Sequence, residues 1–316
     1  MSFSNNPLLE DAHGRSFYAS NKAYTLPVDK EERKRLDRQH EMIRLKYRGL
    51  YLRPKDVRRV LAVRPGYTPT ILDIGTGSGI WPIEMAREFP HAQVLGVDLV
   101  SPVFTMGLPP NCRFISHDVN DGLDQFGMTF DFVNIRCVDQ GITSYHDLVS
   151  AIAKILRPGG IFHSLGGNCD TYDEQFGPVT TKNEDEPGFS WTAKLFHAFY
   201  GAVLRRSPAI SDVPGMPSWL KEMNCWEDCG GDEVRLPYGP WEQDVHEKLV
   251  GDRMRNAMFA ISTPMRGILE LEGHPAETVD LWITKSFEEL QSQKRHLYTE
   301  FHFAWAVKKR SPVASL

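Results

Sequence analysis

The feature that most constrains the fold is a regular alternation of short apolar segments and helical segments between residues 70 and 166. Apolar strands separated by helices in this way are typical of a parallel sheet that is covered on both faces. We therefore predict a doubly wound α/β fold. The predicted strands cover residues 70–75, 93–98, 113–118, 130–136 and 161–166, and the helices between them cover 80–89 and 145–156, with a turn at 157–160.

The rest of the 316-residue chain does not follow this alternation. Residues 1–22 are polar and are expected to be loose or to fold over another part of the chain, and a Pro-rich bend is expected at 208–217. Late strands at 232–239 and 296–309 complete a mostly parallel sheet of seven strands. Helices are expected at 29–50, 55–63, 191–206, 242–270 and 276–294. We predict an N-terminal segment and helical cover over 1–66, and one domain over 67–316 with an inserted helical lid at about 170–230.

Composition places the chain among ordinary globular proteins, with 41% hydrophobic and 24% charged residues. The net charge of −5 creates no overall attraction to nucleic acid or anionic lipid, so neither is expected as a partner. The five cysteines are scattered without zinc-binding spacing, so we expect reduced thiols and no metal site. With no secretory or membrane-spanning apolar segment, we expect a cytoplasmic location, with the nucleus as the alternative.

A glycine-rich turn follows the first predicted strand, with the sequence Asp73-Ile-Gly75-Thr-Gly77-Ser-Gly79. Glycines let the backbone turn tightly and approach a ligand closely. A dinucleotide fingerprint has a further glycine at the position of Ile80, so the spacing favours a nucleoside ligand without a pyrophosphate. Asp73 is suited to a positively charged amino group on that ligand.

Two acidic residues end the next two predicted strands. Asp98 lies 23 residues after Gly75, where a carboxylate accepts hydrogen bonds from both ribose hydroxyls. Asp118 is placed to accept from an adenine amino group, with Val119 beside the ring. Each residue alone is more often a cap or turn former, but their order along successive strands favours a ligand site.

These segments resemble the class I S-adenosylmethionine-dependent methyltransferases, which have a Rossmann-like fold. ILDIGTGSGIW matches their first motif, VLGVD the second, and LRPGG the segment before the fifth strand. A further resemblance, over about 20–310, is to the fungal methyltransferase group typified by LaeA. It is carried by YTLP (24–27) with Asp29, by RQH (38–40) and by LPYGPW (236–241). The chain departs from that group at Asn134, where many relatives have histidine, and in the loop 99–103.

The resemblance implies S-adenosyl-L-methionine as the cofactor, and a lid formed by the N-terminal helices and the segment after the fifth strand. Arg136, at the end of the fourth strand, is assigned to the methionine carboxylate or the substrate, with a salt bridge as the alternative. The predicted cofactor-binding residues are Tyr24, Asp73, Gly75, Thr76, Gly77, Asp98, Leu99, Asp118, Val119 and Arg136.

Methyl transfer depends mainly on holding the acceptor in line with the methyl group, and a general base is needed only for a protonated acceptor. Candidate bases are His163 in the fifth strand and His197 in the following helix, each with a core or surface histidine as the alternative. Further candidates are His117, His146 and Tyr172. An apolar substrate pocket is predicted from Trp81, Tyr172, Phe196 and Tyr200, with core packing as the alternative.

The sequence thus predicts an enzyme that methylates oxygen, or less favourably sulfur or nitrogen, of an apolar or aromatic small molecule in fungal secondary metabolism. The alternative is a LaeA-like nuclear regulator that acts through protein partners. A nicotinamide-dependent oxidoreductase is the third hypothesis, and the turn spacing argues against it. The sequence does not identify the methyl acceptor or the oligomeric state.

Overall fold

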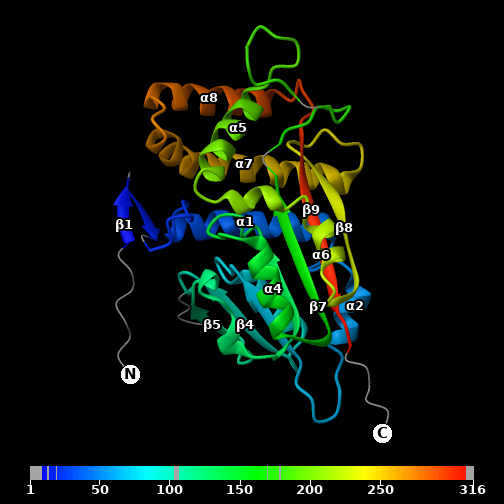
Figure 1. The fold of residues 1–316 in the computed structure, drawn as a ribbon. Coiled ribbons are helices and arrows are strands. Elements are labelled where there is room, and N and C mark those ends of the chain that lie inside the picture. The colour runs from blue at the N-terminus through cyan, green and yellow to red at the C-terminus, as the bar shows by residue number, and fades with distance from the viewer. Residues whose placement is uncertain are drawn as a thin grey trace. The chain divides into compact units, whose positions relative to one another are not determined.

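A computed structural model describes residues 9–12, 14–18, 20–102, 107–168, 170–177 and 179–310 (Figure 1). Val103 in the loop after the second predicted strand, and Cys169, lie outside these residues. The chain forms two compact units, each assembled from three segments. We call them the sheet unit, which comprises Tyr47–Gly167, Ser211–Val234 and Phe301–Leu316, and the helical unit, which comprises Met1–Lys46, Asn168–Ile210 and Arg235–Glu300.

The sheet unit is built on five parallel strands that follow one another along the chain, which confirms the predicted doubly wound α/β fold. The sheet order is β5-β4-β3-β6-β7-β9-β8, and β9 pairs antiparallel with β7, so the seven-stranded sheet is mostly parallel. The order changes direction at β3, and ligands bind beyond the carboxyl ends of the strands at such a point. The strands are β3 (Thr70–Ile74), β4 (Gln93–Asp98), β5 (Cys112–Ser116), β6 (Phe130–Arg136), β7 (Leu156–Gly167), β8 (Trp226–Pro237) and β9 (Tyr298–Lys308).

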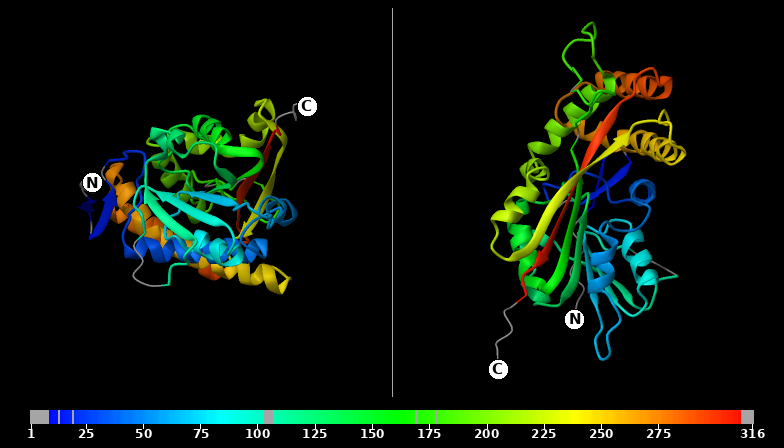
Figure 2. Two further views of the ribbon diagram at one scale, coloured as in Figure 1. Left: turned by 90° about the horizontal axis from the view of Figure 1, so that it is seen from below. Right: turned by 90° about the vertical axis from the view of Figure 1, so that its right-hand side faces the viewer.

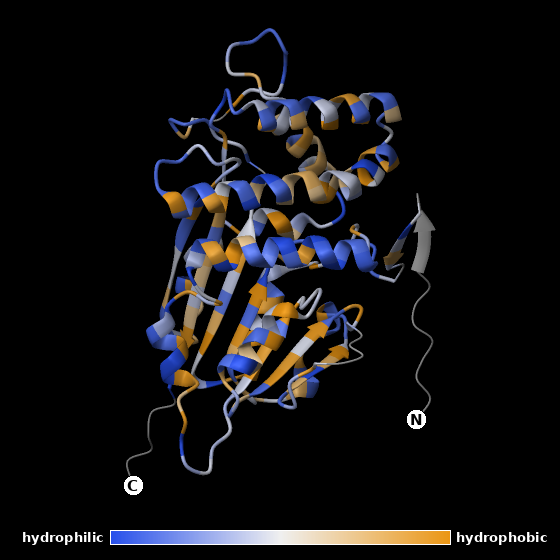
Figure 3. Ribbon diagram, turned by 180° about the vertical axis from the view of Figure 1, so that it is seen from behind, coloured by the Kyte–Doolittle hydropathy of each residue, from blue (hydrophilic) through white to orange (hydrophobic). Residues whose placement is uncertain are grey.

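Helices cover both faces of this sheet (Figures 1 and 2). Helices α2 (Pro54–Val60) and α3 (Ile80–Glu88) lie on one face, and α4 (Tyr145–Ile155) lies on the other. The strands are largely apolar, as their burial between helices requires (Figure 3). The core on the α2 and α3 side includes Val57, Trp81 and Phe132.

The helical unit has a core of its own, formed by three helices. They are α5 (Trp191–Leu204), α7 (Val245–Leu271) and α8 (Ala276–Ser292). Leu195, Phe199 and Ile268 are buried in this core. A buried hydrogen bond also joins α5 to α8, in which Ser286 Oγ donates to Thr192 Oγ1 at 3.1 Å.

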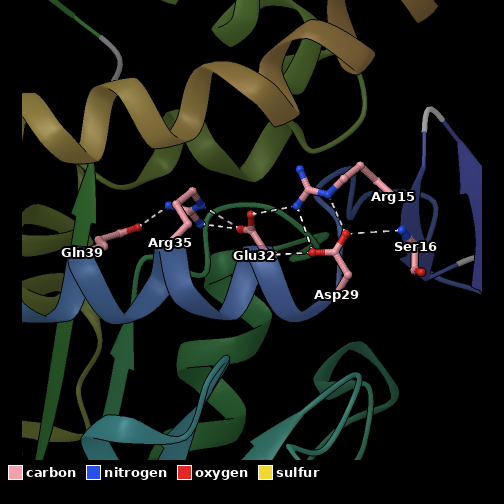
Figure 4. A network of polar contacts seen from close by, with 6 residues as sticks. All are labelled: Arg15, Ser16, Asp29, Glu32, Arg35 and Gln39. Carbon is pink, nitrogen blue, oxygen red and sulfur yellow. Dashed lines mark hydrogen bonds and ion pairs between the residues drawn. The ribbon is translucent and has the colours of Figure 1, made fainter.

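A charged network fixes the start of α1 (Lys30–Tyr47) in the helical unit (Figure 4). The Asp29 carboxylate accepts from the Glu32 backbone amide at 2.9 Å and from the Arg15 guanidinium. Glu32 in turn accepts from Arg35 at 2.6 Å, and Arg35 donates to Gln39 at 2.7 Å. Asp29 therefore serves as an N-cap of α1. Acids before and in the first turn also interact favourably with the positive end of the helix dipole. Arg15 belongs to β2 (Arg15–Tyr18), which pairs antiparallel with β1 (Leu9–Ala12).

The structure differs from the predicted elements in three places. The described part of residues 1–22, expected to be loose or to fold over another part of the chain, contains the β1–β2 hairpin. The bend expected at 208–217 includes the 3₁₀ turn at Pro208–Asp212, and the short helix α6 (Met216–Glu222), which was not predicted, follows it. Helix α4 ends at Ile155, and β7 begins at Leu156, so the predicted turn at 157–160 is an irregularity inside a strand, opposite Phe130 and Phe132.

The segment predicted as a lid, about 170–230, is divided between the two units at residues 210 and 211. Over the described residues, no helix is both long enough and apolar enough to cross a membrane.

Candidate functional site

The glycine-rich turn joins β3 to α3 and is held against the end of β4. Gly75, Gly77 and Gly79 have φ angles of +69°, +56° and +82°, which are unfavourable for residues with a Cβ. The backbone amides of Gly75 and Thr76 both donate to the Val97 carbonyl, at 2.8 and 3.2 Å. The turn therefore has a fixed shape before any ligand arrives.

The loop after β6 packs directly against this turn. A Cβ on Gly75 would lie 2.0 Å from Val138 Cγ1, a distance that real Cβ contacts do not show. Glycine at position 75 is therefore required by close packing as well as by its φ angle. The first glycine of the motif brings two strand ends together and leaves no room for a larger residue.

Asp98, at the end of β4, is oriented by two backbone amides. Its Oδ2 accepts from Gly77 N at 2.7 Å, and its Oδ1 accepts from Val100 N at 3.2 Å. The carboxylate thus lies at the mouth of the glycine turn and fixes the loop that begins with Leu99. Carboxylate oxygens in this position are suited to accept hydrogen bonds from hydroxyl groups.

Asp118 follows β5 and caps the 3₁₀ turn at Val119–Asp121. Its Oδ1 accepts from the backbone and side-chain nitrogens of Asn120, at 3.0 and 2.8 Å. Asn120 also donates to the Gly141 carbonyl at 2.7 Å and accepts from Thr143 N at 3.0 Å. Asn120 therefore joins the loop after β5 to the loop after β6. Sequence reasoning missed this residue, because an asparagine after a strand usually indicates only a turn.

Asp73 is buried beneath the turn, with 4% of its surface exposed. Its oxygens accept from Asn134 Nδ2 at 2.7 Å and from Thr76 Oγ1 at 2.8 Å. Burial raises the pKa of Asp73 to about 6, while these hydrogen bonds and the charge of Arg136 oppose the rise. Asn134, where the sequence departs from the LaeA-like pattern, thus has a defined role as a donor to Asp73.

Arg136 ends β6 and lies close to Asp73. Burial lowers the pKa of Arg136, and the negative charge of Asp73 opposes this effect. Burial likewise raises the pKa of Tyr47, with Arg136 opposing the rise. Cys137 has a φ of +54° and donates its amide to the Leu165 carbonyl at 2.7 Å, so the chain turns sharply at this strand end.

A second partly buried carboxyl, Asp139, lies in the same loop. Tyr145 Oη donates to Asp139 Oδ1 at 3.0 Å, and a Cβ on Gly166 would lie 2.6 Å from that oxygen. Burial raises the pKa of Asp139 to about 7, and hydrogen bonds from Tyr145 and from the backbone amides of Asp139 and Gly167 oppose the rise. No sequence motif marked Asp139, since its environment depends on β7 and α4.

The structure therefore groups nine of the predicted cofactor residues in the sheet unit, at or just after the carboxyl ends of β3 to β6. They are Asp73, Gly75, Thr76, Gly77, Asp98, Leu99, Asp118, Val119 and Arg136.

Two predicted residues of the sheet unit lie in its core. His163 is 2% exposed, and its ring lies 5.0 Å from the rings of Phe132 and Phe303. Burial lowers its pKa to about 3. Trp81 is also 2% exposed, and its indole N–H donates to the Leu50 carbonyl at 2.7 Å. Both environments favour the alternative interpretation, core packing, over roles as a base and a pocket wall.

Five predicted residues belong to the helical unit, so their roles at the site stay predictions. Phe196 is buried and stacks on Tyr238 with ring centroids 6.1 Å apart, and Tyr24 and Tyr200 pack against the same core. Tyr172 pairs through its backbone with Tyr298. His197 is exposed on α5.

Comparison with known proteins gives consistent results. A family described as "Methyltransferase domain" matches residues 71–160, which contain the glycine turn and Asp98. The secondary metabolism regulator laeA of Coprinopsis cinerea is 30% identical over 297 residues, covering 92% of this chain and 71% of that protein. Methyltransferase pytC of Aspergillus terreus is 28% identical over 249 residues, covering 78% of this chain and 71% of that protein.

A solved phosphoethanolamine N-methyltransferase 2 of Haemonchus contortus, in complex with S-adenosyl-L-methionine, shares 16% identity. It covers 88% of this chain and 60% of that one, with a TM-score of 0.42.

Proposed function

Because the chain belongs to the LaeA-like group of S-adenosylmethionine-dependent methyltransferases, we propose that it transfers a methyl group to a hydroxyl oxygen of an apolar or aromatic small molecule. The observation that carries the proposal is the pairing of Asp98 with the glycine turn. Asp98 Oδ2 lies 2.7 Å from Gly77 N, so the carboxylate and the close-packed turn form one surface.

The residues present fit the cofactor. Gly75 and Gly77 allow the backbone to approach a nucleoside closely, and Asp98 supplies the acceptor that a ribose needs. Asp118 and Val119 follow β5, where we assign them to the adenine, and Arg136 is the last residue of β6, where we assign it to a carboxylate. When bound, the cofactor supplies an electrophilic methyl group on a sulfonium.

The described residues at this site act mainly by holding the methyl donor in place. The turn, Asp98 and Asp118 hold the donor in one orientation, because each is itself fixed by hydrogen bonds. Holding two reactants in line converts a bimolecular step into an effectively unimolecular one. A hydroxyl acceptor also needs a group that removes its proton.

Calorimetric titration with S-adenosylhomocysteine and with NAD⁺ tests the cofactor assignment. We expect S-adenosylhomocysteine to bind and NAD⁺ not to bind. The reverse result contradicts the proposal and supports the oxidoreductase hypothesis.

A regulator acting through protein partners is the second candidate, because the Coprinopsis cinerea relative is named a secondary metabolism regulator. A pull-down from a fungal extract, combined with methyl transfer assays on a panel of phenolic compounds, separates the two. Turnover of any phenol supports the enzyme, whereas recovery of protein partners with no turnover supports the regulator.

A further inference from the structure

Asp139 lies next to the glycine turn, although no motif includes it. The preceding residue, Val138, occupies the space that a Cβ on Gly75 would need, 2.0 Å away. On its other side, Asp139 Oδ1 lies 2.6 Å from the position of a Cβ on Gly166, near the end of β7. The carboxyl is therefore fixed between the carboxyl ends of β6 and β7, one residue from the packing contact that supports the turn.

The groups around Asp139 hold it in one position and leave it able to change its charge. Tyr145 from α4 donates to it at 3.0 Å, and the Gly167 amide from β7 also donates. Cys137 from its own loop and Asp212 from the neighbouring 3₁₀ turn act on Tyr145 electrostatically. Burial brings the pKa of Asp139 to about 7, which is the range in which a general base works at neutral pH.

We propose that the Asp139 carboxylate faces the methyl group being transferred and accepts the proton of the acceptor hydroxyl. The inference rests on the proposed function. In this step the acceptor oxygen forms a bond to the methyl carbon, and the sulfur keeps the electron pair of the bond that breaks. The hydroxyl proton goes to Asp139, which returns it to solvent after the product leaves.

Two other buried titratable residues of the sheet unit, His163 and Asp73, are less suited to this role. The ring of His163 packs between Phe132 and Phe303 within the sheet, and its pKa of about 3 makes it a weak base. Asp73 already accepts hydrogen bonds from Asn134 and Thr76 beneath the turn. Asp139 differs because it lies in a loop beyond the strand end rather than within the sheet.

The test compares the protons exchanged when S-adenosylmethionine and S-adenosylhomocysteine bind. The first ligand carries a sulfonium charge and the second does not, so only the first lowers the pKa of a carboxylate that faces the sulfur. Calorimetry in phosphate and in Tris at pH 7 gives the number of protons released. We expect S-adenosylmethionine to release up to about half a proton more, because a group with a pKa of about 7 is half protonated there.

Three variants make the result specific to Asp139. Asp139→Asn removes the difference between the ligands. In the wild type, the hydrogen bond from Tyr145 lowers the pKa of Asp139. Tyr145→Phe removes this bond and raises that pKa, so the pH at which the difference in proton release is largest moves upward. Asp147→Asn, an exposed carboxyl on the same helix as Tyr145, leaves the difference unchanged.

Each outcome decides the proposal. Failure of the wild-type protein to bind either ligand refutes the proposed function. Binding of both with equal proton release, or a difference that persists in Asp139→Asn, refutes the role of Asp139 alone. If Asp139→Asn does not fold, an unshifted maximum in Tyr145→Phe contradicts the inference.

Discussion

Two neighbouring parts of the sheet unit differ in whether their polar residues form a recognisable sequence motif. At the ends of β3 and β4, the glycine turn and Asp98 belong to one recognisable sequence pattern. They are also close in space, because Gly77 N donates to Asp98 Oδ2 at 2.7 Å. At the ends of β6 and β7, Asp139 meets Tyr145 and Gly166 only after the sheet and α4 have assembled. The first part has a motif because backbone shape dictates its residues, whereas the second depends on tertiary packing.

The largest expected effect is at Gly75, where close packing and a positive φ angle both require glycine. Gly75→Ala places a Cβ 2.0 Å from Val138 Cγ1 at a φ of +69°, so overpacking should cost about 1–3 kcal/mol of unfolding free energy and abolish measurable S-adenosylhomocysteine binding. Gly66→Ala is the matched control, since Gly66 has a φ of +72° but nothing within 4 Å of its Cβ position. Equal effects of the two substitutions, measured by urea unfolding and calorimetry, would mean that packing against Val138 is unimportant.

Asp98→Ala should have the next largest effect, on affinity. Two hydrogen bonds to a charged acceptor, at about 1.5–3 kcal/mol each, correspond to a loss of about a hundredfold or more in affinity for S-adenosylhomocysteine. Asp121→Ala, an exposed acid in the next loop, is the control and should bind as the wild type does. An unchanged dissociation constant for Asp98→Ala would show that the ribose lies elsewhere.

At the other strand ends, Asp139→Asn should change the pH dependence of stability. The native pKa of Asp139 is about 7, above its ordinary value of 3.8, so the native state binds more protons than the unfolded state between about pH 4 and 7. Wild-type stability therefore falls as pH rises through this range, by at most about 1.4 kcal/mol per pH unit from this group.

Asparagine cannot ionise, so the variant lacks this loss and should gain stability relative to wild type as pH rises from 5 to 7. Urea unfolding at pH 5, 6, 7 and 8 measures the difference, and the contribution of Asp73 cancels because both proteins retain it. A constant difference across these pH values would show that Asp139 titrates normally.

Asn120→Ala should have the smallest effect. Asn120 is exposed but contacts Asp118, Gly141 and Thr143, so its loss should cost about 1 kcal/mol and weaken S-adenosylhomocysteine binding several-fold through Asp118. Asn183→Ala, an exposed loop asparagine of the helical unit, is the control. Loss of affinity as large as that of Asp98→Ala would indicate direct contact between Asn120 and the ligand.

Much of the fold could be predicted from the sequence because parallel strands between helices are continuously apolar. The five strands at 70–166 and the parallel arrangement follow from that pattern. The irregular start of β7 could not be predicted, since Pro158 and Gly159 ordinarily end an element, and only pairing with β6 continues the strand there. The β1–β2 hairpin and α6 are short elements without a strong period.

The candidate site divides in the same way. Glycine spacing and strand-terminal acids identified the turn, Asp98 and Asp118, because these positions depend on local backbone geometry. For His163 and Trp81, residue type left core packing open as the alternative, and the burial of both side chains favours that alternative. Asn120, Asn134 and Asp139 carried no local signal, because each acts on a residue from another loop or strand.

A crystal structure of the protein with S-adenosylhomocysteine would test the position of the ligand at the carboxyl ends of β3 and β4 most directly. We expect the ribose hydroxyls on Asp98, the adenine beside Val119, and the sulfur on the side of the turn that faces Asp139. A ligand bound away from the carboxyl ends of β3 and β4, or a sulfur that faces away from Asp139, would contradict this expectation.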